Sequence, residues 1–175
     1  NGKQVREYLF TYTENSYVST EVNLLAPHLI NSPVAMAAQT GDVDNEGNYL
    51  YIVNADGTVA VFITNRAESV TAWTRFTTDG DIKDVAVVED VVYFHVKRTM
   101  NGSTIYTIEA LDNNTYTDSA VHVVNSPASA TVTGLDHLNG QECRVRADSS
   151  VMDNATPASG SITLARTATN IEEIG

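Results

Sequence analysis

The run NYLYIVNADGTVAVFITN, residues 48–65, limits the possible folds more than any other part of this chain. β-Branched and aromatic residues alternate with others on both sides of Asp56-Gly57, a pattern typical of paired strands. Asp-Gly is a strong signal for a two-residue turn, because Gly adopts positive φ angles at no steric cost. The run therefore predicts an antiparallel hairpin over residues 49–64.

A similar hairpin recurs further along the chain. Its strands are predicted over 91–96 and 103–111, with a turn at Asn101-Gly102. A strand of small apolar residues precedes each hairpin, PVAMAAQ at 33–39 and DVAVVE at 84–89, and an outer strand at 70–76 follows the first. The resulting repeat of about 50 residues is typical of four-stranded propeller blades.

The predicted fold class is all-β, with antiparallel sheets in two propeller-blade-like four-stranded repeats and a small C-terminal β module. Two blades do not close a ring, which usually takes at least about four. The repeats therefore form either part of a propeller or two sheets packed as a sandwich. We expect three regions: 1–32, a strand and a short helical segment; 33–125, the two repeats; and 126–175, the small module.

The two flanking regions differ from the repeats in composition. In STEVNLLAPHLI, Ser19 or Thr20 is a candidate helix cap, and Pro27 limits the helix to a turn or two. After residue 126, Ala, Ser and Thr dominate. There QECRVRAD (141–148) predicts a strand with Cys143 and Val145 on one face, and GSITLART (160–167) is its expected partner.

Charge narrows the functional classes. Ten Lys and Arg stand against 22 Asp and Glu, a net charge of -12, which disfavours tight binding to nucleic acid or to anionic membranes. This net charge is compatible with DNA that passes nearby without binding. No apolar run approaches the roughly 20 residues that span a bilayer, and the single cysteine excludes an internal disulfide. The missing initiator Met and the end at IEEIG predict a fragment of a longer protein.

DVDNEG, residues 42–47, is the best metal candidate. Asp42, Asp44 and Glu46 take the first, third and fifth positions of a calcium loop, with Gly47 in the sixth. The twelfth position should be a bidentate Glu and is Val53. An acidic solvated turn is the better interpretation, so we expect no metal site and no cofactor.

Reactive groups give no catalytic pattern. The four histidines are dispersed, without HxxxH or HExxH spacing; they are His28, His95, His122 and His137. Cys143 has Glu142 and Arg144 beside it and no adjacent His, which favours an inert structural thiol. GxSxG, SxxK, Walker and GxGxxG motifs are all missing from the sequence. We therefore expect no enzyme.

Two further candidates for a functional site are the carboxylates at turns and the only tryptophan. Asp56-Gly57 and Asp79-Gly80-Asp81 could supply paired carboxylates for work on a sugar, but turn chemistry explains them better. Trp73 is either a sugar platform or a packing anchor between sheets, and its position near Val70 and Phe76 favours the anchor.

The stretch DGTVAVFITNRAESVTAWTRFTTDGDIKDVAVVEDVVYFHVKR, followed by GSTIYTIEALD, resembles a repeat in virion proteins of tailed bacteriophages. The family is the tail nozzle, or tail tubular protein B, of short-tailed phages. In that family the elements of the repeat recur in a fixed order. A hairpin with a DG turn comes first, then a strand that contains Trp, and then Gly before a strand of small residues. A strand that ends in Lys or Arg follows, and the last strand ends in an acidic residue and Leu. Those places hold Asp56-Gly57, Trp73, Gly80, residues 85–87, Arg98 and residues 109–111.

YVSTEVNLLAPHLI, GLDHLNGQECRVRADSS and ITLARTATNIEEIG also resemble the flanks of such proteins. Nozzle proteins are far longer than 175 residues, which agrees with a fragment. The resemblance implies a structural protein of the virion tail, assembled as a ring of its own copies with other tail proteins. DNA would leave through the ring without specific binding, and no membrane insertion is implied. The alternative is a receptor- or carbohydrate-binding β module that uses exposed tyrosines.

Overall fold

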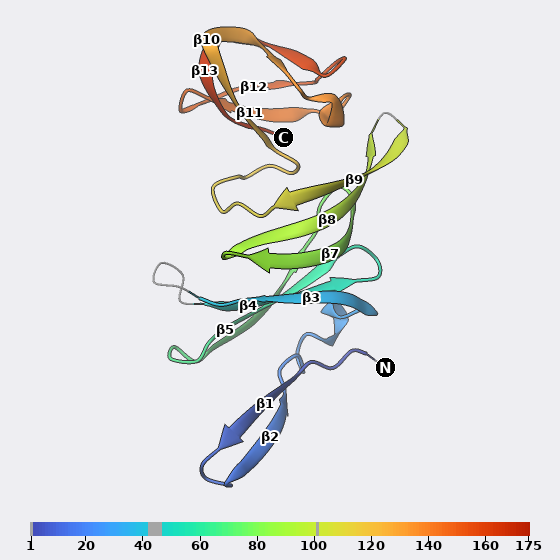
Figure 1. The fold of residues 1–175 in the computed structure, drawn as a ribbon, viewed down its shortest axis with the longest axis vertical. Coiled ribbons are helices and arrows are strands. Elements are labelled where there is room, and N and C mark those ends of the chain that lie inside the picture. The colour runs from blue at the N-terminus through green and yellow to red at the C-terminus, as the bar shows by residue number, and fades with distance from the viewer. Residues whose placement is uncertain (1, 42–46, 101) are drawn as a thin grey trace. The chain divides into compact units, whose positions relative to one another are not determined.

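The computed structural model describes residues 2–41, 47–100 and 102–175, and it is an all-β protein (Figure 1). Strands make up 62% of it, in four antiparallel sheets, none of them closed. Average globular proteins have about 20–25% strand, so the all-β prediction is confirmed. Within the described ranges the only helical segments are two single 3-10 turns, Pro27–Leu29 and Asp136–Leu138.

The chain divides into two compact units. Unit 1 comprises Asn1–Lys97 and Tyr106–Leu111, and unit 2 comprises Arg98–Ile105 and Asp112–Gly175. The predicted boundary at residue 125 falls inside strand β10 (Val121–Thr133).

Unit 1 contains a two-stranded sheet, a four-stranded sheet and most of a three-stranded sheet, each connected in chain order; residues 98–100 and 103–105 of the third sheet belong to unit 2. The strands are β1 (Arg6–Thr11), β2 (Ser16–Glu21), β3 (Pro33–Gln39), β4 (Asn48–Asn54), β5 (Val59–Asn65), β6 (Val70–Phe76), β7 (Asp81–Val88), β8 (Val91–Met100) and β9 (Ser103–Ala110). The β3–β6 sheet has the four strands predicted for the first repeat, in the predicted order. The second repeat differs, because β7, β8 and β9 form a sheet of three described strands instead of four.

The hairpin loop between β4 and β5 is longer than predicted. Val53 pairs with Val59, and the Asn54 N–H donates to the Thr58 carbonyl at 2.8 Å. Gly57 alone in this loop has a positive φ, +83°. The loop is therefore three residues long, with a left-handed Gly at its end, instead of a two-residue turn in which Asp56 would also be left-handed.

Gly57 is also required by its surroundings. Its carbonyl accepts the N–H of Ile82 at 3.1 Å. A Cβ at this position would lie 2.8 Å from the Cα of Asp81. The loop is thus fixed against β7, the first strand of the next sheet.

Two other tight turns place residues other than glycine in the left-handed region. Glu89 and Asp90 connect β7 to β8 with φ angles of 49° and 65°. Asp148 and Ser149 connect β11 (Cys143–Ala147) to β12 (Ser150–Ala155) with angles of 46° and 61°. Part of the predicted turn at Asn101-Gly102 lies outside the described residues, which include Gly102 but not Asn101.

The main core of unit 1 lies between the β3–β6 and β7–β9 sheets. It is formed by Tyr51, Val53, Val59, Val61, Ile82, Val85, Val92, Phe94 and Val96. Ala35 and Ala37 of β3 pack against it, and β3 runs close to β7. Small side chains in β3 therefore permit this close approach.

The N-terminal region is a hairpin and a short turn, and the predicted helix cap is wrong. Ser19 and Thr20 lie in β2, where they pair with Tyr8 and Glu7 of β1. Strand pairing replaces the capping role, and Pro27 begins a 3-10 turn of only three residues, where a proline needs no N–H partner.

Unit 2 folds as one four-stranded sheet in the order β10-β13-β11-β12, where β13 is Ser161–Ile174. The predicted strand with Cys143 and Val145 on its buried face is confirmed as β11. Its predicted partner is wrong, because residues 161–163 pair with β10. β11 pairs instead with β12 and with the later part of β13, where Arg146 faces Glu173.

The core of unit 2 is aliphatic. It consists of Val132, Leu135, Leu138, Cys143, Val145, Ala147, Ile162, Leu164, Ala168, Ile171 and Ile174. The register of β10 against β13 shifts at three places. Such irregularities increase the local twist, which helps a single sheet to enclose these side chains.

Candidate functional site: the aromatic face of the N-terminal hairpin

Cys143 and the four histidines do not form a reactive centre. Cys143 is buried, its Sγ lies 3.6 Å from the Gln141 carbonyl, and burial raises the pKa of its thiol. Such a thiol is a poor nucleophile. His122 bonds to the Asn170 side chain and His137 to the Ser119 carbonyl, while His95 contacts the Tyr106 ring.

Metal ligands do not gather in the described part of the chain, where no group of three or more His, Cys, Asp or Glu side chains could hold an ion. The calcium candidate at 42–47 is not covered by that search, because Asp42, Asp44 and Glu46 lie outside the described residues. Its weak match to a calcium loop therefore stays a sequence-based interpretation.

Two of the turn carboxylates, Asp56 and Asp81, have polar or charged partners nearby. Asp56 accepts hydrogen bonds from Thr58 and Asn31, and these bonds, that of the Thr58 hydroxyl first, lower the pKa of its carboxyl group. Asp81 lies 3.4 Å from Lys83 and 4.0 Å from Lys97. A general acid needs a raised pKa, so Asp56 is unsuited to that role.

Trp73 packs against the segment that follows the N-terminal hairpin. Its Nε1 donates to the Val22 carbonyl at 2.9 Å, and its ring centroid lies 4.8 Å from that of Phe62, its cross-strand neighbour. It joins a second, smaller cluster with Ile30, Ile52 and Ala60. Trp73 is therefore an anchor, as favoured, but it holds the N-terminal segment to the β3–β6 sheet and is half-buried.

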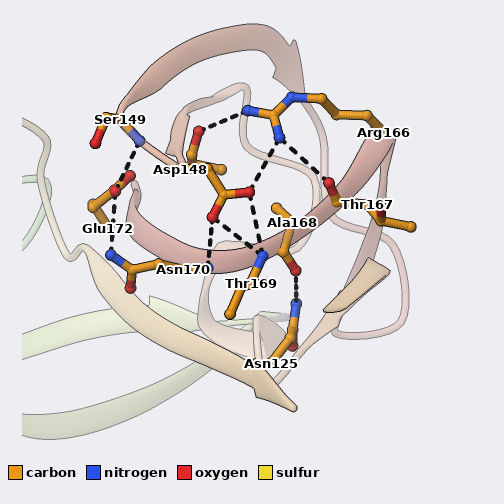
Figure 2. Close-up of polar contacts among 10 residues, drawn as sticks. Asn125, Asp148, Ser149, Arg166, Thr167, Ala168, Thr169, Asn170 and Glu172 are labelled. Atoms are coloured by element: carbon orange, nitrogen blue, oxygen red, sulfur yellow. Dashed lines mark hydrogen bonds and ion pairs between the residues drawn. The ribbon is translucent and has the colours of Figure 1, made fainter. Parts of the chain in front are cut away.

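A polar network in unit 2 closes the β11–β12 turn (Figure 2). The Asp148 carboxylate accepts the N–H groups of Thr169 and Asn170 at 3.2 and 2.9 Å and an Arg166 N–H at 3.1 Å. The Asn170 N–H is the main cause of a lowered pKa at Asp148. Its donors all belong to β13, so the network fixes the β11–β12 turn against that strand.

The most distinctive exposed surface is one face of the β1–β2 hairpin, which we call the aromatic face. Phe10 is paired with Tyr17, and Tyr8 with Ser19, so these side chains share one side of the ribbon. Tyr8 and Tyr17 stack at 5.1 Å with planes 2° apart, and Phe10 meets Tyr12 and Tyr17 edge to face, at 5.3 Å each.

The four rings remain open to solvent. Their exposed fractions are 70% for Tyr8, 37% for Phe10, 92% for Tyr12 and 61% for Tyr17. Exposed aromatic clusters mark binding surfaces, because each ring combines a large apolar area with little side-chain entropy. At the base of the same face, Arg6 is paired with Glu21 in the strand register.

Two hollows in unit 1 include residues of the hairpin in their walls. One of about 280 Å³ includes Glu7, Phe62 and Arg66 in its wall, and one of about 550 Å³ includes Arg6, Pro33 and Met36. None of the four rings contributes to either wall. The aromatic face is therefore an open surface and not the lining of a pocket.

Sequence reasoning overlooked this hairpin. We expected one strand and a helical segment in residues 1–32, yet EYLFTYTENSYVSTE has an aromatic residue at every second position from Tyr8 to Tyr12, and another, Tyr17, after Glu14-Asn15. Asn15 has a positive φ of 47°. Period-two spacing of Tyr8, Phe10 and Tyr12 was the signal that predicts a strand with one aromatic face.

No known family model matches this chain, and no curated protein matches it. A membrane-spanning helix, which requires a long apolar run, is also missing from the residues that the structure describes.

Proposed function

We propose that this chain is a structural protein of a bacteriophage tail, part of a nozzle-like assembly that forms the conduit for genome ejection. The observation that carries the proposal is the ordered resemblance over residues 56–111. Within unit 1 its Asp56-Gly57 signal belongs to a hairpin loop and its Trp73 to the following strand. Both are packing positions, as expected of a scaffold.

In this proposal the β3–β6 sheet is one propeller-like blade and the β7–β9 sheet is an incomplete second one. Open sheets and an exposed aromatic face favour assembly, since each needs a neighbour to cover it. The partners are other copies of the chain, as a ring-like homo-oligomer, and other tail proteins. The net charge of -12 would keep DNA from adhering as it passes. The chain has no catalytic role, does not insert into membranes and is located in the tail of the virion.

The test is to locate the protein in phage particles. Antibodies against the purified chain, applied to virions of the phage that encodes it, should label the tail in electron micrographs. An amber mutation in the gene should yield particles that lack a complete tail. Normal particles from the amber mutant, or virions free of the protein by mass spectrometry, would contradict the proposal.

A second candidate, a receptor- or carbohydrate-binding module, is favoured by one observation. Three of the eight tyrosines, Tyr8, Tyr12 and Tyr17, gather on the aromatic face, and planar rings stack well on sugars. Glycan-array binding by the purified chain that disappears with Tyr17→Ser would support this candidate.

A further inference from the structure

The β1–β2 hairpin lacks the means to cover its own aromatic face. It is a two-stranded sheet of six-residue strands, and an isolated hairpin of this size is marginally stable in water. Its base is closed by the Val22 N–H, which donates to the Val5 carbonyl, and by the buried Asn23, which bonds to Val5 and Lys3. Its attachments to the rest of unit 1 include the bond from Trp73 to the Val22 carbonyl and the ion pair of Arg66 with Glu7, on the other side of the ribbon from Tyr8. These bonds do not involve the four rings.

The area of the face agrees with a small protein interface. From the exposed fractions of the four rings, and about 150–250 Å² for each aromatic side chain, roughly 500 Å² is open to contact. Two such faces in contact would bury about 1,000 Å² in all, the lower limit for a specific interface. A second copy thus has enough surface for a weak but specific contact.

The strand register makes the face complementary to itself. Consider a second copy turned by half a rotation about an axis parallel to the strands, so that each β1 lies over the other copy's β2. Pairs within one hairpin are then repeated between copies: Phe10 meets Tyr17 of the second copy, and Arg6 meets its Glu21. A two-fold contact requires this reciprocity, and here it joins ring to ring and positive to negative charge.

The two charged groups stay available for such a pairing. Arg6 donates within the hairpin to the Ser19 side chain at 2.9 Å and to the Ser19 carbonyl at 2.8 Å. Glu21 accepts from Gln4 at 3.1 Å. These bonding partners are neutral, so the two charges are preserved.

We propose that the aromatic face binds the same face of a second copy of this chain, through the rings of Tyr8, Phe10, Tyr12 and Tyr17 and the reciprocal pair of Arg6 and Glu21. The inference goes beyond the proposed function, because a two-fold contact closes a pair of copies, whereas the contacts that build a ring are head-to-tail. A sugar on the face is the competing outcome.

Sedimentation velocity of the whole chain over a series of concentrations tests the rings. The wild-type protein should self-associate reversibly, and Tyr17→Ser should weaken this association about tenfold or more, since it removes a ring from each side of the contact. Tyr106→Ser is the matched control, because Tyr106 of β9 is 61% exposed, like Tyr17. It should leave the association unchanged. Tyr12→Ser, in the turn, repeats the test if Tyr17→Ser does not fold.

Mixing two charge variants tests the register. Arg6→Glu makes both positions negative, and Glu21→Arg makes both positive, so each variant alone should associate about tenfold more weakly than wild type. An equimolar mixture should recover the association, because opposite charges then meet between copies while each hairpin keeps its own repulsion. A mixture no stronger than its components would overturn the proposed register.

A monomeric wild-type protein at all soluble concentrations would overturn the proposal, as would equal effects of Tyr17→Ser and Tyr106→Ser. A monomer whose binding to a glycan array needs Tyr17 would assign the face to sugars instead. These results are separate from tail labelling. Labelled tails with a monomeric chain would remove this inference alone, and self-association without tail labelling would remove the proposed function alone.

Discussion

The two units are stabilised by different kinds of buried side chain. Aromatic rings connect the core of unit 1, where Phe94 contacts Tyr51 and Phe76 with centroids 6.1 and 5.3 Å apart. The core of unit 2, as described, is aliphatic apart from Cys143. The buried polar residues differ as well: unit 1 buries Asn23 and Asn54, whereas unit 2 buries Arg98 and Glu173.

This difference predicts how each unit responds to mutation and to a change of pH. Neutral amides keep their hydrogen bonds at any ordinary pH, so unit 1 depends mainly on apolar packing. Unit 2 relies on ionised groups: Arg98 lies 3.0 Å from Asp118, and Glu173 accepts the Tyr116 N–H at 2.6 Å and the Thr117 hydroxyl at 2.8 Å. We therefore expect core truncations to affect unit 1 most, and loss of charge to affect unit 2.

Phe94→Ala should produce the largest loss. Phe94 is buried at the meeting point of three rings, and truncating a buried Phe costs about 3–5 kcal/mol. Urea unfolding followed by circular dichroism measures the change in the free energy of unfolding. Tyr106→Ala, on an exposed ring, should stay within about 0.5 kcal/mol. A loss below about 1 kcal/mol for Phe94→Ala would show that rings do not hold this core together.

Trp73→Ala should cost less than Phe94→Ala, about 2–4 kcal/mol, because the ring is half-buried although its N–H bond to Val22 is lost as well. The same unfolding measurement applies. Limited proteolysis should then cut the segment at residues 22–30 sooner. Trp73→Phe keeps a ring and removes the N–H, so about 1 kcal/mol is expected. Unchanged proteolysis would contradict the anchoring role.

Glu173→Leu tests the charged side of the comparison. It removes the acceptor from the Tyr116 N–H and should cost about 2 kcal/mol. Glu173→Gln retains a side-chain carbonyl and should cost less. Urea unfolding of both variants, with Asn54→Ala as the neutral counterpart in unit 1, measures the contrast. A Leu variant more stable than wild type would mean that desolvation of the carboxylate outweighs its hydrogen bonds.

Gly57→Ala separates the effect of close packing from that of backbone angle. Ala at a positive φ costs about 1–2 kcal/mol, and at Gly57 the new Cβ would also meet the backbone of Asp81. Gly102→Ala is the control, since its φ is +74° and nothing lies within 4 Å of an added Cβ. We expect about 2 kcal/mol at Gly57 and about 1 at Gly102, from thermal unfolding. Equal losses would contradict a loop fixed against β7.

Acid should act through Asp148. Hydrogen bonds lower its folded-state pKa, so the stability that it provides is present above the unfolded carboxyl pKa of about 3.9 and is lost as pH falls through the lower folded value. Unfolding midpoints measured from neutral pH to below pH 4 should fall less steeply for Asp148→Asn. Hydrogen bonds also lower the pKa of Asp56 in unit 1, so Asp56→Asn measures how much of this acid sensitivity unit 1 shares. If it flattens the profile as much, acid sensitivity does not distinguish the units.

Much of the β3–β6 sheet could be predicted because local signals and tertiary packing agree there. Alternating apolar residues define β4 and β5, and small residues define β3, next to β7. The three-residue loop could not be predicted from Asp56-Gly57 alone, because that signal does not show where the next sheet lies. The packing of Trp73 on Val22 is similarly a long-range contact, between residues 51 positions apart.

Other elements depend on pairing with strands that their own sequence does not identify. β12, SVMDNA, has little strand propensity of its own and is extended because β11 pairs with it. Residues 160–167 lie closer in sequence to β11, yet their first residues pair with β10. The aromatic face could have been predicted from the spacing of its rings, but its exposure depends on what unit 1 leaves uncovered.

The left-handed turns at Glu89-Asp90 and Asp148-Ser149 have an evolutionary consequence. Side chains with a Cβ are strained there, whereas Gly or Asn would accept the same backbone more easily. Nine residues other than Gly have positive φ angles in the described chain. The sequence therefore lies well short of the most heat-resistant one for this fold. At Glu89 and Asp90, single substitutions to Gly or Asn should therefore offset lost contacts elsewhere, which gives the exposed surfaces room to change.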